Sequence, residues 1–223
     1  MRLRLRPSGP PRGERPDGPF TGYKLAHAVL SADGTRAGFA GLTLGSTQPY
    51  GLTADACCVW NSHHAPPRRW CGCGFYCLHA LGDAVALGCA TENRAALLLG
   101  VAAAGRYIRY ERGLRYSRQR VRVIKESRCG CGLAGSALAD AGSGMTGWRQ
   151  LVPVCERCAD GRPALTLSEF AARLDGLVRV ERAPADPVQF PVSPLSPMNS
   201  AELSAEIALL HARLDDLQSR LDH

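Results

Sequence analysis

Aromatic residues and long apolar runs are both scarce in this chain of 223 residues. Only 6% of its residues are aromatic, whereas 24 are glycine and 15 are proline. We therefore expect a small hydrophobic core that needs support from metal ions or disulfides. The most apolar stretch, residues 95–104, is about half as long as the ~20 residues that a membrane-spanning helix requires. The sequence thus predicts a protein without membrane contact.

An apolar signal segment is also missing, because residues 1–19 are basic and rich in proline and glycine. Without a sign of export we expect a cytoplasmic location, where disulfides are rare. Metal ions then remain as the expected support of the fold.

Motifs of the common enzyme classes are absent as well. No phosphate-binding loop or dinucleotide-binding motif occurs in the sequence. The zinc-deaminase pattern fails, because there is no His-x-Glu and because Val154 separates Pro153 from Cys155. Each metal set described below has four protein ligands, which is the arrangement of structural metal sites. The sequence therefore predicts a non-enzymatic protein.

Composition divides the chain into four segments. Residues 1–19 are expected to be a disordered basic tail, and residues 20–183, which hold all ten cysteines, a folded domain. Five prolines within residues 184–198 predict an extended linker. Residues 199–223 form the last segment, which has a different pattern.

In this last segment apolar residues recur at alternating intervals of four and three, which predicts a short coiled-coil helix. These residues are Leu203, Ile207, Leu210, Leu214, Leu217 and Leu221. We expect the helix to join copies of the chain as a homo-oligomer or to bind a protein partner. A helix that docks back onto the domain is the alternative.

Strands dominate the expected domain. Residues 115–124 and 178–182 alternate between polar residues and β-formers, which predicts two strands. Thr166 and Glu169 have the spacing of a capping box, so a helix should begin there and continue through Phe170, Ala171, Leu174 and Leu177. The expected fold class is a β-rich (α+β), zinc-stabilised domain with a short coiled-coil helix at the C-terminus.

Close pairs of cysteines predict metal ligation. Two stretches read Cys-Gly-Cys-Gly, beginning at Cys71 and Cys129, and a third pair is Cys155-x-x-Cys158. Glycine permits the sharp turn by which two thiolates reach one ion about 2.3 Å away. Zinc accepts tetrahedral sulfur and imidazole ligands without redox chemistry, so we expect one or two Zn2+ ions.

The pairs group into two candidate ligand sets. The stronger set joins two pairs across a loop and consists of Cys129, Cys131, Cys155 and Cys158. The other set mixes thiols with an imidazole and consists of Cys58, His63, Cys71 and Cys73. In this second set Cys57 could replace Cys58, His64 could replace His63, and Cys77 could also be a ligand.

Other roles for the cysteines remain open. Cys57, Cys77 and Cys89 could be small buried apolar residues. Four thiolates could also hold an iron–sulfur cluster, although the histidine and the Cys-Gly-Cys-Gly pairs favour zinc. A thiol redox sensor that releases zinc upon oxidation would use the same residues.

The first ligand set lies in a stretch that resembles a known family. The residues are Cys58, then His63-x-Ala-Pro, then Cys71-x-Cys73-Gly-Phe-Tyr76. They resemble an uncharacterised family of actinobacterial proteins with a Cys…His-x-Ala-Pro…Cys-x-Cys-Gly-[Ile/Phe/Leu]-Tyr-Ala signature and no established activity. The likeness covers roughly residues 22–183 and implies the same four ligands. Cys77 stands where the family has alanine, which argues against Cys77 as a shared ligand.

Basic residues concentrate in residues 106–128. This stretch holds nine basic and two acidic residues, so its net charge of +7 equals that of the whole chain. Residues 111–114 are expected to form the turn of a hairpin. Tyr107, Tyr110 and Tyr116 interleave with the basic residues, as contact with phosphates and stacking on bases would require. The candidate nucleic-acid contacts are Arg106, Arg109, Arg112, Arg115, Arg118, Arg120 and Arg122.

A solvated sheet face is the other explanation for this stretch. The leading hypothesis is a regulatory or nucleic-acid-binding module whose C-terminal helix adds avidity. The alternatives are a protein-interaction scaffold with structural zinc, in which the helix is the working part, and the redox sensor described above.

Overall fold

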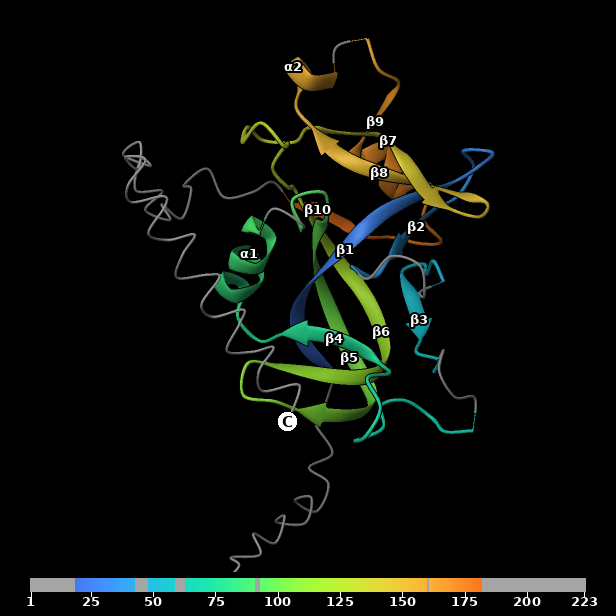
Figure 1. Ribbon diagram of the computed structural model, residues 1–223, viewed down its shortest axis with the longest axis vertical. Coiled ribbons are helices and arrows are strands. Elements are labelled where there is room, and N and C mark those ends of the chain that lie inside the picture. The colour runs from blue at the N-terminus through green and yellow to red at the C-terminus, as the bar shows by residue number, and fades with distance from the viewer. Residues whose placement is uncertain (1–18, 43–47, 59–62, 91–92, 160, 182–223) are drawn as a thin grey trace, which may run out of the picture. The chain divides into compact units, whose positions relative to one another are not determined.

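The computed structural model describes residues 19–42, 48–58, 63–90, 93–159 and 161–181 (Figure 1). These residues belong to one unit of the chain, Met1–Ala183. The predicted tail, linker and coiled-coil helix lie outside the described residues, apart from Pro19. No helix among the described residues has the length and apolar character needed to cross a membrane.

The described fold is β-rich, as the sequence predicts, with ten strands and three short helices. The strands are β1 (Phe20–Ser31), β2 (Ala37–Ala40), β3 (Thr53–Asp55), β4 (Phe75–Leu78), β5 (Leu97–Arg109), β6 (Gly113–Lys125), β7 (Ala137–Met145), β8 (Trp148–Val154), β9 (Ala164–Thr166) and β10 (Arg179–Glu181). The helices are α1 (Leu81–Cys89), α2 (Glu156–Ala159) and α3 (Leu167–Ala172).

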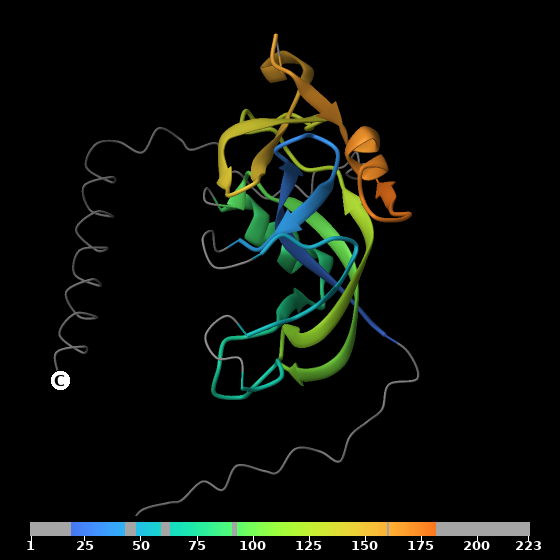
Figure 2. The ribbon, with the colours of Figure 1, turned by 90° about the vertical axis from the view of Figure 1, so that its right-hand side faces the viewer.

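Strand β1 takes part in two sheets. Residues 20–26 pair with β5, whereas residues 27–31 pair with β2 on one side and with β8 on the other. The second sheet continues from β8 to β7 and then to β9. In Figures 1 and 2, β7, β8 and β9 therefore lie at one end of β1, and β4 with the β5–β6 turn lies toward its other end.

Four strands close into a hydrogen-bonded ring. β1 pairs with β5, β5 with β6 and β6 with β4, and β4 returns to β1 through the pair Leu78 and Tyr23. The main core consists mostly of leucine, alanine and valine, and it has few aromatic members. Phe39, Tyr116 and Phe170 are its largest members and are fully buried.

The β5–β6 hairpin is the longest feature of the fold, with 13 residues in each strand. Its turn lies between Arg109 and Gly113, where the sequence predicts one. A bulge in β5 shifts the register between Ala104 and Tyr107. Across from it the alternation of β6 slips, because Tyr116 and Gln119 are both buried and hydrogen-bond to each other at 3.1 Å. The tip of the hairpin and its body therefore present different faces to solvent.

Helix α3 begins at the predicted capping box but ends at Ala172, so the predicted extension to Leu174 and Leu177 is wrong. The Glu169 backbone N–H donates to the Thr166 hydroxyl, and the Thr166 backbone N–H donates to the Glu169 carboxylate. The helix places Phe170 against Phe39 in the core. After it, β10 pairs in parallel with the end of β6, and Lys125 forms an ion pair with Glu181.

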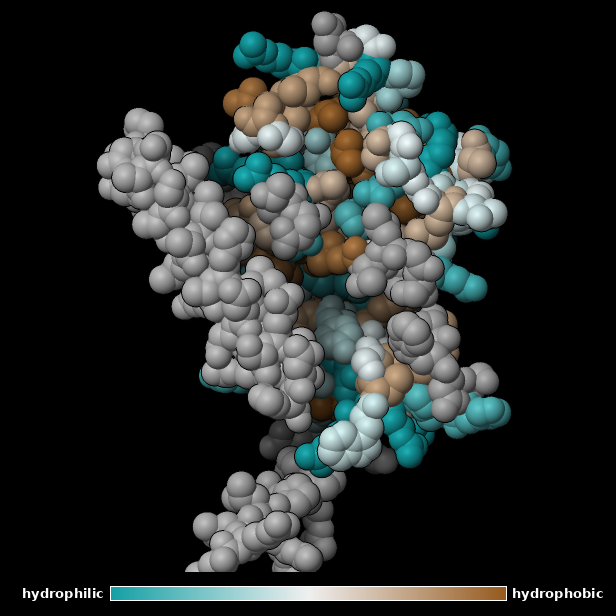
Figure 3. All heavy atoms as spheres, viewed as in Figure 1, coloured by the Kyte–Doolittle hydropathy of each residue, from teal (hydrophilic) through white to brown (hydrophobic). Residues whose placement is uncertain are grey.

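Apolar side chains leave only scattered patches on the face seen in Figure 3, among polar neighbours. A second, smaller apolar cluster contains Cys129, Ala139, Val154 and Cys155. It has no large side chain in its buried part, so burial alone contributes little to the stability of this end of the fold.

Candidate metal centres

The first candidate centre lies between β3 and β4. Four side chains from this connection offer ligand atoms that all lie within 4.8 Å of one another: Cys58, His64, Cys71 and Cys73. The Cys58 and Cys71 sulfurs are 3.7 Å apart, and His64 Nε2 is 3.3 Å from the Cys73 sulfur. We name this group centre 1.

The second candidate centre lies where β6 and β8 end. Cys129 and Cys131 follow β6. Cys155 lies between β8 and α2, and Cys158 lies within α2. Their four sulfurs also lie within 4.8 Å of one another, and the Cys131 and Cys155 sulfurs are 3.6 Å apart. We name this group centre 2; it contains the four residues that the sequence predicts.

The sulfur separations fit a shared metal ion. Two thiolates at tetrahedral angles and about 2.3 Å from one ion are about 3.8 Å apart. The separations of 3.6 and 3.7 Å are close to this value and far from the ~2.05 Å of a disulfide. Both groups could therefore hold a metal ion.

At centre 1 the structure corrects the predicted histidine. The sequence pattern favours His63 as the ligand and leaves His64 as its alternative, and the structure gathers His64 with the three cysteines. Consecutive side chains leave the backbone in different directions, and His64 is the histidine whose ring nitrogen joins the group of three sulfurs. The same reason separates Cys58, which joins the group, from the exposed Cys57.

The remaining cysteines have different surroundings. Cys77 is 4% exposed and packs in the main core, where burial raises the pKa of its thiol. It is the small buried apolar residue that the sequence suggests. Cys89 is exposed at the end of α1, so the same interpretation is wrong for Cys89, and Cys57 is exposed too.

Glycine follows the second cysteine of each Cys-Gly-Cys pair for a backbone reason. Gly74 has φ +115° and Gly132 has φ +92°, a region that other residues rarely adopt. A Cβ atom on Gly74 would also lie 3.1 Å from the Arg115 side chain, whereas one on Gly132 would meet nothing within 4 Å. The glycine inside each pair, Gly72 or Gly130, has no positive φ.

The turn at centre 2 stabilises a thiolate. The backbone N–H of Cys131 donates to the Cys129 sulfur and lowers the pKa of that thiol to about 6. Hydrogen bonds with the Cys131, Cys129 and Cys155 side chains raise the pKa of Cys158 to about 12. A bound cation would favour the thiolate form of all four residues.

Arg115 holds the connection that contains centre 1. This side chain is only 4% exposed, and its guanidinium donates to the carbonyl oxygens of Cys71 and Arg68, the latter at 3.0 Å. It also lies near the rings of Tyr76 and Tyr110, at 5.8 and 5.9 Å from their centres. The sequence pattern assigns Arg115 to the basic surface, and the structure instead buries it beneath the metal-binding loop.

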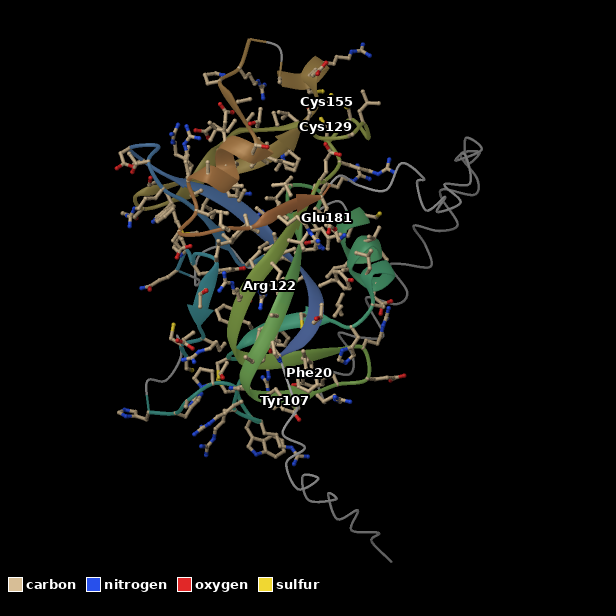
Figure 4. The ribbon with its side chains drawn as sticks, turned by 180° about the vertical axis from the view of Figure 1, so that it is seen from behind. Phe20, Tyr107, Arg122, Cys129, Cys155 and Glu181 are labelled. Carbon is tan, nitrogen blue, oxygen red and sulfur yellow. The ribbon has the colours of Figure 1, made fainter. Side chains whose placement is uncertain are left out.

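The two centres lie at opposite ends of the β5–β6 hairpin. Cys73 precedes β4, which pairs with β6 beside the hairpin turn, whereas Cys129 follows the far end of β6. Thirteen residues of extended strand span about 40 Å. Figure 4 shows Cys129 and Cys155 at one end of the fold and Tyr107 with Phe20, near the turn, at the other.

The other candidate arginines of the hairpin are exposed, but two of them meet carboxylates. Arg118 contacts Asp55 at 2.6 and 3.2 Å, and Arg112 contacts Asp83 at 2.5 and 3.3 Å. These partners come from distant parts of the sequence, so the local net charge of +7 overstates the charge of this surface. The exposed arginines without an ion pair to a described residue are Arg106, Arg109, Arg120 and Arg122.

The tyrosines of the hairpin also differ from the prediction. Tyr116 is fully buried, and Tyr107 packs edge-on against Phe20 at 5.0 Å between ring centres. Only Tyr110 is exposed, at 46%. Alternation in the sequence could not show this, because the bulge changes which side of the strand faces solvent.

Substitution of the two histidines tests centre 1. His64→Ala should remove one of two bound metal ions per chain, and His63→Ala should leave both, because only His64 faces the three sulfurs. Cys58→Ser and Cys57→Ser form a second matched pair with the same expectation. The measurement is the metal content of protein purified under reducing conditions. Loss of metal in the His63 variant alone would show that the ligand assignment is wrong.

The two glycines of centre 2 provide a second test. Gly132→Ala should lower the free energy of unfolding by about 1–2 kcal/mol, because alanine is strained at positive φ. Gly130→Ala is the matched control and should cost little, since its φ is ordinary and no atom lies within 4 Å of the added methyl group. Denaturant unfolding in the presence of metal measures both; equal effects would contradict the backbone argument.

Arg115→Lys should weaken centre 1 without changing the charge. A lysine ammonium cannot bridge two carbonyl groups as the planar guanidinium does, and hydrogen bonds from a charged donor contribute about 1.5–3 kcal/mol. We expect one metal equivalent to transfer to a coloured chelator on the order of tenfold faster, with the second unchanged. Arg122→Lys is the control and should release both ions at the unaltered rate. Identical traces for the two variants would exclude the bridging role.

Comparisons of the chain with protein-family models, with curated proteins and with solved structures found no match. The resemblance to the actinobacterial family therefore stays a prediction. The site is described by its own geometry: two groups of four ligands at the ends of a basic hairpin.

Proposed function

We propose that this chain is a non-enzymatic, zinc-stabilised module that binds nucleic acid through the outer face of β6. One observation carries the proposal. Three arginines, Arg118, Arg120 and Arg122, recur at every second residue of one strand and are all exposed. Arg118 and Arg120 point to the same side because alternate residues of a strand do so, and the exposed Arg122 follows them at a register shift of β6.

Zinc is the ion that we propose for both centres. Three thiolates with one imidazole, and four thiolates, are both common zinc ligand sets. The imidazole of His64 argues against an iron–sulfur cluster at centre 1, since most such clusters take four thiolates. Four protein ligands fill a tetrahedral shell and leave no position for a substrate, so the proposed role of both ions is structural.

Zinc would supply stability where the apolar core is small. The cluster behind centre 2 contains only short side chains, among them Ala139 and Val154. A metal ion that binds the folded chain and not the unfolded one adds its binding free energy to folding. The ends of the hairpin would then stay ordered and keep its arginines in place.

Small neighbours leave the arginine row accessible. Arg118 and Arg120 pair across the sheet with Ala104 and Ala102 of β5, and Arg120 pairs with Thr53 of β3 on its other side. Asp55 is the carboxylate in contact with the row and binds Arg118. Arg120 and Arg122 therefore offer their charge to a phosphate backbone, and Figure 4 shows Arg122 on the hairpin face turned to the viewer.

Self-association remains part of the proposal. Residues 199–223, which carry the predicted coiled-coil pattern, lie outside the described residues. If they join two copies, two arginine faces act on one nucleic acid, and avidity raises the apparent affinity without any new contact.

Binding across a salt series tests the function. The double variant Arg120→Gln/Arg122→Gln should bind a labelled DNA duplex on the order of tenfold more weakly at low salt. The slope of log affinity against log salt should fall in magnitude by up to about 1.8, or about 0.9 for each phosphate that is no longer neutralised. The matched control is Arg149→Gln/Arg157→Gln, which removes the same charge from β8 and α2.

The zinc content of each variant, expected at two ions per chain, serves as the folding control. Equal loss of affinity in both double variants would mean that only total charge matters. Absence of binding by the natural chain, even at low salt, would exclude the proposed function and leave a protein-interaction scaffold.

A further inference from the structure

We propose that Trp70 stacks on an unpaired base and makes the module prefer single-stranded nucleic acid, an inference that rests on the function proposed above. The Trp70 side chain is 89% exposed, although tryptophan has the largest side chain of any residue. It lies directly before Cys71, within the connection that forms centre 1.

The loop that carries Trp70 is bound by an arginine that also contacts two exposed tyrosine rings. Among the described residues, the large aromatic side chains that are exposed are Trp70, Tyr76 and Tyr110. The Arg115 guanidinium contacts both tyrosine rings and binds the loop on which Trp70 lies. The buried Arg115 thus links two exposed tyrosine rings to the backbone of the loop that carries the exposed Trp70 ring, and we call these three aromatic residues the aromatic surface.

The backbone on both sides of Trp70 is held in place. Arg115 binds the carbonyl oxygen of Arg68, two residues before Trp70, and that of Cys71, the residue after it. Cys71 and Cys73 belong to centre 1, and the Tyr76 hydroxyl donates to the Gly72 carbonyl at 2.9 Å. A ring on an ordered loop can stack on a ligand without the entropic cost of ordering that loop.

The charge beside the ring suits nucleic acid better than an apolar protein surface. Arg68 and Arg69 are both exposed, and neither forms an ion pair with a described residue. The Arg69 guanidinium lies 5.6 Å from the centre of the Trp70 ring. An aromatic ring flanked by cations matches a base with its phosphates, and this combination is how proteins bind single strands.

Stacking requires a base whose face is accessible. In a duplex both faces of each base are covered by its neighbours, whereas in a single strand the bases can turn outward. The arginine row of β6 contacts phosphates in either form. Trp70 would therefore set the preference for single strands, while the row supplies affinity for both.

The test compares Trp70→Ala with Leu177→Ala on two probes, labelled oligothymidylate and a labelled duplex. Leu177 is 92% exposed, so Leu177→Ala is the matched control, in which a different exposed apolar side chain is removed. We expect Trp70→Ala to weaken oligothymidylate binding on the order of tenfold and to leave duplex binding unchanged. The tenfold figure follows from the roughly 1–3 kcal/mol that one stacked base contributes to binding. Trp70→Phe should recover part of the loss, and zinc content should stay at two ions.

Each other outcome has a definite meaning. Unaltered oligothymidylate binding by Trp70→Ala, with binding still weakened in Arg120→Gln/Arg122→Gln, overturns the stacking role and leaves the proposed function standing. If Trp70→Ala loses affinity equally for both probes, the stacking role is also overturned, because the loss of stacking on unpaired bases cannot weaken binding to a duplex. If the natural chain binds neither probe, both proposals are overturned and the aromatic surface is assigned to a protein partner.

Discussion

The backbone hydrogen bonds along β1 hold the described fold together. This one strand belongs to both sheets, and both metal-binding ends attach to strands that pair with it. Centre 1 leads directly into β4, which pairs with β1 at Tyr23, and centre 2 follows β8, which pairs with β1 from Ala28 onward. Because an unpaired buried backbone group is costly, neither sheet can separate from β1 without leaving backbone groups of β1 unpaired at a cost in free energy. The two centres are thus linked through a single strand although they lie far apart.

The two proposed ions lie in different surroundings. Centre 2 adjoins a cluster of short side chains, whereas centre 1 leads into β4, where Phe75 packs near the buried Tyr116. At centre 1 the buried guanidinium of Arg115 adds a second type of support. It would also offset the net charge of about −1 that three thiolates and one Zn2+ ion carry. Charge and proposed ligation at this end therefore add to the burial of Tyr116 and Leu114.

The sequence predicted local features well and distant contacts poorly. Spacing alone predicted the two cysteine pairs that the structure gathers in centre 2, the hairpin turn and the capping box at Thr166, because each pair, turn or cap depends on residues close in the chain. The choice between His63 and His64 depends on backbone direction in a loop, which composition does not reveal. The burial of Arg115 depends on a loop more than 40 residues away, and the pairing of Arg118 with Asp55 spans 63 residues. A count of charges along the hairpin could not include either contact.

The pairing of β1 with β8 has a consequence for synthesis of the chain. His27 and its hydrogen-bonding partner Gln150 are 123 residues apart. At a ribosomal rate of about 5–20 residues per second, half of β1 waits about 6–25 s for that partner to emerge. All four ligands of centre 1 emerge during this interval, before the sheet can close. The nascent chain thus carries an unpaired strand edge and reactive thiols together, and early capture of a metal ion would protect it from aggregation and oxidation.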